Sequence, residues 1–248
     1  MITSAHDPGY AGIDWRDKGF PALPAGTTVS QFVAARPSLF DAGFNWPVMA
    51  LRESAVAHNI DVLARWCSSS GISLAPHGKT TMMPALFARQ LAAGAWAMTA
   101  ATPWQVRAYR EFGVPRVLLA NELVDAAFVE WLTTQLADPG FDFLCYVDSV
   151  AGAQLLAGAA GSVARPIKVL LEAGLPGGRT GARTDDDAET VARAVQHLPA
   201  LSLVGVAGYE GPLGHDRDPE TLSAVGAYVA RLAGLLRRLD AAGLLDAR

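Results

Sequence analysis

The chain has 248 residues, of which 51% are apolar, 8% aromatic and 18% charged. This composition is typical of a compact α/β protein that buries a large core, and it argues against disorder. The formal net charge of −4 arises without a basic block, so we expect no nucleic-acid partner. The sequence has no signal-peptide pattern and no uninterrupted apolar run of about 18 residues. We therefore expect no membrane association and a cytoplasmic location.

The two cysteines give no metal or disulfide pattern. Cys67 and Cys145 lie far apart in the sequence, without the paired spacing of a zinc site or a redox motif. We expect both to be ordinary semi-buried thiols, and we predict no metal ligands in this chain.

The first 45 residues form an irregular arm in our interpretation, because they are rich in Gly, Pro and aromatic residues and have weak periodicity. Residues 46–248 form the predicted main domain. Within it, Pro47–Ser54 resembles a strand, and residues 55–71 carry apolar side chains at the spacing of a helix face that ends at Gly71.

From Gly71 onward, short apolar runs alternate with amphipathic stretches, which is the signature of repeated βα units around a parallel sheet. Six strands are predicted: ISLAPH from Ile72, WAMTAA from Trp96, RVLLAN from Arg116, FDFLCYV from Phe141, IKVLLEAG from Ile167 and LSLVGVAGY from Leu201. The pattern predicts an α/β fold, a (β/α) TIM-type barrel with about six of its eight units present. The alternative is an open doubly wound sheet, which usually has a Gly-rich phosphate turn after its first strand; here PHGKTT follows it.

Lys79 stands just beyond the first of these strands. Functional side chains of parallel βα proteins lie at the carboxyl ends of strands, and the immediate neighbours of Lys79 supply no carboxylate to pair with it. We expect its amine to be partly desolvated, which makes a lysine nucleophilic toward an aldehyde. By position alone, a solvated loop lysine is the competing interpretation.

The run LAPHGKTTMMPALFARQLAAGAWAMTAATPWQV, followed by GVPRVLLANELVD, resembles the D-serine dehydratase-like and D-threonine aldolase-like branch of the fold-type III pyridoxal-phosphate (PLP) enzymes. These proteins share the barrel of the alanine racemase N-terminal domain. The branch includes bacterial proteins called amino acid deaminases. The resemblance implies that Lys79 forms the Schiff base with PLP and that His77 lines the site, as either a catalytic or a hydrogen-bonding group.

Further cofactor contacts are predicted at the later strand ends. The segment EAGLPGGRTGAR resembles the Gly-x-x-Arg-x-Gly turn of alanine-racemase-like barrels, which implies that Arg179 contacts the phenolic oxygen of PLP. Tyr209 in VAGYEG stands where relatives carry a side chain that faces the pyridine ring. Asn121 either hydrogen-bonds in the site or caps the following helix. The competing interpretations are a solvent-facing Arg179 in a flexible glycine turn and a core Tyr209.

The resemblance implies a PLP-dependent lyase that deaminates a D-β-hydroxy amino acid, as D-serine dehydratase-like enzymes do. Aldolase cleavage of the D-threonine type, racemisation and a non-catalytic PLP carrier remain alternatives. Relatives hold zinc through His and Cys of a C-terminal β domain and sometimes pair as homodimers. The sixth unit ends in a helix that begins near Ser223 and is predicted to reach Arg248. We therefore expect a truncated barrel that lacks this domain and binds PLP weakly.

Overall fold

The computed structural model describes residues 12–246. The start of the predicted arm, residues 1–11, and the end of the predicted last helix, residues 247–248, lie outside the described residues. The chain divides into two compact units, residues 1–72 and 73–248. The division leaves the helix that follows the predicted arm in the first unit.

The first unit contains helices α1 (Val29–Ala35) and α2 (Glu53–Ser69). The predicted helix after the arm is thus confirmed, and Gly71 follows it with a φ of 66°. The predicted strand at Pro47–Ser54 is wrong, since residues 47–52 have no strand pairing. A strand exists only through a hydrogen-bonded neighbour, and the described part of this unit offers no other strand. Ile13 and Cys67 are its buried hydrophobic side chains.

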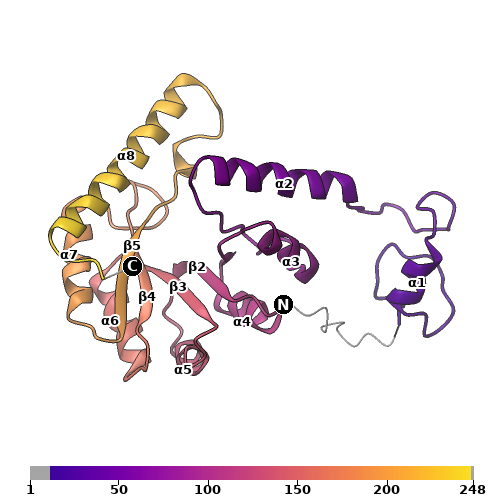
Figure 1. Cartoon of the computed structure of the whole chain (residues 1–248), viewed down its shortest axis with the longest axis horizontal. Coiled ribbons are helices and arrows are strands. Elements are labelled where there is room, and N and C mark those ends of the chain that lie inside the picture. Colours follow the sequence, from indigo (N-terminus) through magenta and orange to yellow (C-terminus); the bar gives the residue numbers. More distant parts are fainter. Residues whose placement is uncertain (1–11, 247–248) are drawn as a thin grey trace. The chain divides into compact units, whose positions relative to one another are not determined.

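The second unit alternates strands and helices along the chain (Figure 1). Its elements are α3 (Pro84–Ala92), β1 (Met98–Ala100), α4 (Pro103–Glu111), β2 (Arg116–Glu122), α5 (Ala126–Gln135), β3 (Asp142–Val147), α6 (Val150–Ala160), β4 (Ile167–Glu172), α7 (Asp185–Gln196), β5 (Leu201–Ala207), the 3₁₀ turn η1 (Gly211–Leu213) and α8 (Pro219–Ala241).

The five strands form one parallel sheet in the order β1-β2-β3-β4-β5. Each strand therefore pairs with its neighbour in sequence, as in a (β/α) barrel, and the order never reverses as it does in a doubly wound sheet. The predicted barrel-type α/β class is confirmed. Beyond β5, the N–H of Asp246 donates to the carbonyl oxygen of Leu203 at 2.9 Å.

The first of the six predicted strands is only partly formed. His77 makes an isolated parallel bridge with Thr99 of β1, and Trp96 and Thr99 donate their N–H groups to the carbonyl oxygens of Leu74 and Pro76 at 2.7 and 2.8 Å. Pro76 has no N–H to donate in return. The segment therefore lies extended beside β1 without a continuous ladder.

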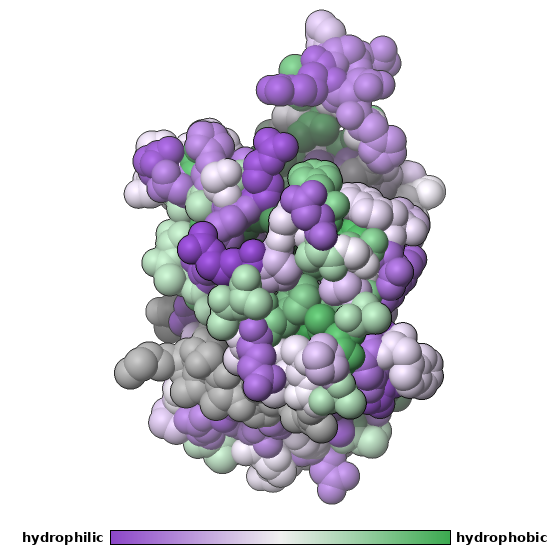
Figure 2. Space-filling view, turned by 90° about the vertical axis from the view of Figure 1, so that its right-hand side faces the viewer, coloured by the Kyte–Doolittle hydropathy of each residue, from purple (hydrophilic) through white to green (hydrophobic). Residues whose placement is uncertain are grey.

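Burial alternates along the strands and separates the two faces of the sheet. Val117 and Leu119 of β2, like Val169 and Leu171 of β4, are fully buried, whereas Leu118 and Leu170 between them are half-buried. Successive side chains of a strand point to opposite faces, so the fully buried set faces the helices. On the surface, apolar and polar side chains are interspersed (Figure 2).

The helices that follow the strands begin at short polar caps. Thr102, Asp125, Ser149, Thr184 and Asp218 each accept a hydrogen bond from a backbone N–H in the first turn of the next helix. These caps fix the connections at the carboxyl edge of the sheet. None of the helices among residues 12–246 combines the length and apolar character needed to span a membrane.

Candidate active site

The carboxyl edge of the sheet carries two long connections, residues 173–184 after β4 and residues 208–218 after β5, whereas the connection after β1 is only residues 101–102. Arg179 lies in the first long connection and Tyr209 in the second. His77 and Lys79 follow the extended segment beside β1, and Asn121 lies near the end of β2. Parallel pairing thus brings all five predicted site residues to one edge.

Close packing at Gly78 positions Lys79. The N–H of Gly78 donates to the carbonyl oxygen of Thr99 at 2.9 Å. A Cβ at Gly78 would overlap Phe87 and would lie 2.6 Å from the hydroxyl oxygen of Tyr109. These two rings are fully buried and meet edge to face with 4.8 Å between their centroids. The glycine before the lysine is therefore required by packing.

Lys79 itself begins a turn over residues 79–81 and is exposed. The exposure of Lys79 therefore does not agree with the partial desolvation that we expected for its amine. Partial burial, together with the nearby charge of Lys79, holds the pKa of His77 below its ordinary value, against a hydrogen bond with the backbone of Thr99. The imidazole is accordingly neutral at neutral pH and can accept a proton beside the lysine.

The turn that carries Arg179 is closed by its glycines. Ala173 and Ala182 form a parallel bridge, and a Cβ on Gly174 would overlap the carbonyl oxygen of Thr180. Gly181 has a φ of 91° and lies equally close to the backbone of Gly174. The backbone of the turn is thus closely packed, but Arg179 itself is exposed, which agrees with the competing interpretation of a solvent-facing arginine; its contact with PLP stays a prediction.

Arg179 and Tyr209 meet across the two long connections. The guanidinium carbon lies 5.9 Å from the centroid of the tyrosine ring, within the range of a cation–π contact. Tyr209 is 51% exposed, so the competing interpretation of a core tyrosine is wrong. Both groups remain accessible to a ligand at this edge.

Asn121 joins two strand ends. Its amide nitrogen donates to the carbonyl oxygen of Ala101 at 3.1 Å, and its amide oxygen accepts from the N–H of Glu122 at 3.0 Å. The cap of α5 is Asp125, which accepts from Phe128, so the expected capping role of Asn121 is wrong. Its contact with a cofactor stays a prediction.

Three carboxylates that the sequence reasoning did not select gather at the same edge. Oxygen atoms of Glu122, Asp148 and Glu172 all lie within 4.8 Å of one another. Each residue stands at the end of a strand or directly after it, so the strand-end rule applied to Lys79 also indicates them. Asp148 accepts the N–H of Gly181 at 3.0 Å, and Glu172 accepts the hydroxyl of Thr180 at 2.7 Å.

Burial and crowding raise the proton affinity of two of these carboxyls, Glu122 and Glu172. Burial, followed by a hydrogen bond with Asp148 and the charges of Asp148 and Glu172, raises the pKa of Glu122 to about 7. Burial also raises the pKa of Glu172, although Thr180 and the two arginines of the turn, Arg179 and Arg183, oppose the shift. One proton shared within the cluster relieves the repulsion.

The carboxylate cluster differs from the zinc site of the relatives. Among residues 12–246 it is the one group of three or more His, Cys, Asp or Glu side chains whose ligand atoms come this close, and it includes neither His nor Cys. Its all-oxygen donor set does not resemble the His and Cys ligands implied for those proteins.

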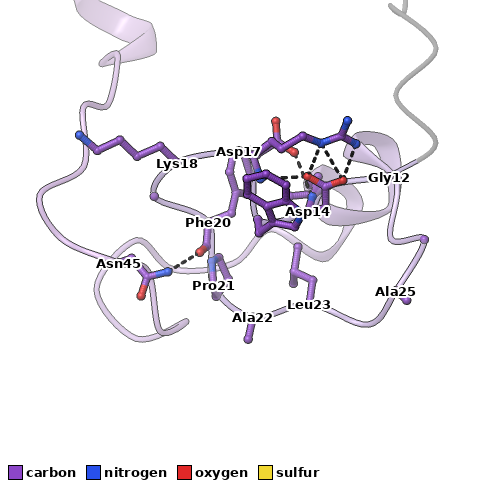
Figure 3. Close-up of a pocket in the computed structure, with 15 residues that line it drawn as sticks. Gly12, Asp14, Asp17, Lys18, Phe20, Pro21, Ala22, Leu23, Ala25 and Asn45 are labelled. Atoms are coloured by element: carbon purple, nitrogen blue, oxygen red, sulfur yellow. Dashed lines mark hydrogen bonds and ion pairs between the residues drawn. The ribbon is translucent and has the colours of Figure 1, made fainter.

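A separate hollow lies in the first unit, lined by residues 12–23, 25 and 26 together with Asn45 (Figure 3). Asp14 lies within it and pairs with Arg16, which lowers the pKa of Asp14 to about 2. Asn45 donates to the carbonyl oxygen of Phe20 at 2.8 Å. None of the predicted site residues lines this hollow, and its polar groups bind one another.

A parallel sheet whose strands pair in sequence order and alternate with helices is the arrangement of a βα barrel. The model of the family "Alanine racemase, N-terminal domain" matches residues 51–247. The chain belongs to this family, which confirms the resemblance to fold-type III PLP proteins.

Three of the relatives carry the names of lyases. The chain is 23% identical over 224 residues to 3-hydroxy-D-aspartate aldolase of Paracoccus denitrificans, covering 89% of this chain and 57% of that protein. It is 28% identical over 180 residues to D-threo-3-hydroxyaspartate dehydratase of a Delftia species, covering 72% and 47%. The crystal structure of D-threonine aldolase from Filomicrobium marinum matches with a TM-score of 0.71 at 26% identity, covering 79% and 54%. The chain thus spans about half the length of the curated relatives it matches.

The packing at Gly78 yields a first prediction. Gly78→Ala will lower the free energy of unfolding by about 1–3 kcal/mol, because the added methyl overpacks the two rings. The matched control is Gly158→Ala in α6, where a Cβ meets nothing within 4 Å and the change will stabilise the helix by about 0.5–1 kcal/mol. Urea unfolding followed by circular dichroism measures both. A Gly78→Ala variant as stable as the parent would contradict the packing argument.

The raised pKa of Glu122 yields a second prediction. The folded chain holds this proton to about pH 7, whereas the unfolded chain releases it near the ordinary value of 4.5, so stability from this group falls as pH rises between these values. Glu122→Gln removes the effect. The melting temperature of Glu122→Gln minus that of the parent will therefore be larger at pH 8 than at pH 5.

Glu189→Gln is the control for this measurement. Hydrogen bonds from Arg193 and Arg238 lower the pKa of Glu189. The stability that this carboxylate contributes is therefore lost only as the pH falls below the ordinary pKa of a glutamate. The difference between Glu189→Gln and the parent will stay constant from pH 5 to pH 8. An equally constant difference for Glu122→Gln would show that Glu122 titrates normally.

Proposed function

We propose that this chain is the PLP-binding part of a lyase that acts on D-configured β-hydroxy amino acids. The observation that carries the proposal is the convergence of Lys79, Arg179 and Tyr209 at one edge of a fold-type III sheet. The three relatives, two aldolases and a dehydratase, are all named for D-β-hydroxy amino acids.

The donor set at the edge suits PLP. An exposed primary amine on Lys79 can condense with the aldehyde carbon with loss of one water. The exposed guanidinium of Arg179 suits the phenolic oxygen, and the accessible ring of Tyr209 suits the pyridine face. Bound PLP supplies a conjugated ring that takes up the electron pair left at the α-carbon of the substrate.

Each side chain at this edge has a distinct role in the proposed reaction. With PLP and substrate bound, the amine of Lys79 would take the proton from the α-carbon of the substrate. His77, which is neutral because its pKa is lowered, would accept this proton from the amine of Lys79 and later return it to the same amine. Arg179 keeps a positive charge beside the ring oxygen, and the carboxylates Asp148 and Glu172 hold the turn that presents it.

Deamination in the manner of D-serine dehydratase is the leading reaction. In the balanced reaction, D-serine loses its β-hydroxyl as water, and the product of this loss takes up one water to give pyruvate and ammonia. Aldolase cleavage is the second candidate, supported by the similarity to the two aldolases, and converts D-threonine to glycine and acetaldehyde. Release of ammonia from D-serine or of glycine from D-threonine separates the two.

Covalent labelling tests the role of Lys79 directly. The chain contains three lysines, Lys18, Lys79 and Lys168, so borohydride reduction with PLP followed by peptide mapping gives an unambiguous answer. We expect the pyridoxyl group on Lys79, because Lys168 pairs with Asp142 at 2.8 Å near the start of β4 and Lys18 lies in the first unit.

Two arginine variants serve as the matched pair. Lys79→Arg will abolish the label, and Lys168→Arg will leave it unchanged. A label spread evenly over the three lysines, or retained in Lys79→Arg, would refute the proposed function.

A further inference from the structure

One buried hydroxyl joins the two connections that carry Arg179 and Tyr209. Tyr228 of α8 is 4% exposed, and its hydroxyl donates to the carbonyl oxygen of Ala173 at 2.5 Å while accepting the N–H of Tyr209 at 3.1 Å. Ala173 begins the first long connection, and Tyr209 lies in the second. A single oxygen atom therefore spans the ends of β4 and β5.

The strands cannot make this connection themselves. Ladder pairing between β4 and β5 ends where the N–H of Ala173 donates to the carbonyl oxygen of Ala207 at 2.9 Å. Beyond that point no backbone hydrogen bond between the two connections is seen among the described residues. Gly208 allows the tyrosine to enter the gap, because a Cβ there would overlap the hydroxyl of Tyr228 and lie 2.9 Å from Leu232.

Arg231 holds the first connection from the same face of α8, three residues beyond Tyr228. Its guanidinium donates to the carbonyl oxygen of Gly174 at 2.7 Å and to the carboxylate of Asp185 at 2.8 Å. These partners stand at the two ends of the turn around Arg179. Tyr228 differs from Arg231 in that it also holds the segment of Tyr209.

We propose that Tyr228 is a positioning residue for the PLP site, whose hydroxyl sets the spacing between the segments that present Arg179 and Tyr209. The residue lines a small pocket together with Glu172, Arg179, Thr180 and Tyr209, so a shift of its ring would move that pocket. Burial raises the pKa of Tyr228, and the hydroxyl therefore remains a donor. The proposal rests on the proposed function, because this spacing matters only if both side chains contact PLP.

Tyr228→Phe removes the oxygen and keeps the ring. Hydrogen exchange of the cofactor-free chain will show faster exchange of the Tyr209 amide and of residues 174–183. With PLP, we expect about a tenfold loss of affinity, equivalent to about 1.4 kcal/mol, and a shifted absorbance of the bound cofactor.

Two control variants on α8 separate positioning from stability. Leu239→Val shortens a fully buried side chain and will lower the melting temperature while leaving the absorbance and the Tyr209 amide as in the parent. Arg231→Gln will speed exchange in residues 174–183 but leave the Tyr209 amide protected. This second variant also tests the assignment if Tyr228→Phe does not fold.

The outcomes distinguish this proposal from the proposed function. Parent-like exchange at Tyr209 and parent-like PLP absorbance in Tyr228→Phe, with only a lower melting temperature, would overturn the positioning role. So would protection lost at Tyr209 in Arg231→Gln. Failure of PLP to label Lys79 in the parent overturns the proposed function instead, and the exchange measurement still decides whether Tyr228 sets the spacing.

Discussion

Parallel pairing of each strand with its neighbour in sequence is the constraint on which the rest of the second unit depends. A parallel strand ends at the same edge as its partner, so residues separated by more than a hundred positions, such as Lys79 and Tyr209, reach one edge of the sheet. The helices between the strands pack against the fully buried face of the sheet. At the opposite edge, Asp142 forms ion pairs with Arg116 and Lys168 at 2.9 and 2.8 Å. These ion pairs link the beginnings of β2, β3 and β4.

Glycine determines how closely segments approach at the carboxyl edge. Gly78 admits the rings of Phe87 and Tyr109, Gly174 and Gly181 face each other across the arginine turn, and Gly208 admits the hydroxyl of Tyr228. Each of these contacts excludes a side chain, so the motif residues around Lys79 and Arg179 are as much packing requirements as chemical ones. The backbone segments of the site therefore lie in close contact.

Much of this arrangement could be predicted from the sequence. Apolar runs give the strands, and the order of strands gives the edge. Position and the family resemblance led to Lys79, Arg179 and Tyr209, whose contacts with a cofactor stay predictions. The strand expected at Pro47–Ser54 was wrong because a strand needs a partner, which no local pattern supplies. The first barrel segment was expected to be a full strand, yet Pro76 limits its pairing.

The residues that support the site were harder to predict. Glu122, Asp148 and Glu172 each follow the strand-end rule, but only the register of neighbouring strands brings their oxygens within 4.8 Å. Tyr228 stands in the middle of an amphipathic helix, where a core role is the ordinary expectation. Its partner Ala173 lies 55 residues earlier in the chain, and nothing local to either residue indicates the contact.

The central claim is that PLP binds at the carboxyl edge of the sheet, between the lysine segment and the two long connections. Hydrogen exchange of the whole chain with and without PLP tests it most directly. The account predicts protection of residues 77–82, 174–183 and 208–213 together, with little change at the strand beginnings near Asp142. Protection confined to the hollow around residues 12–26, or absent from the arginine turn, would contradict it.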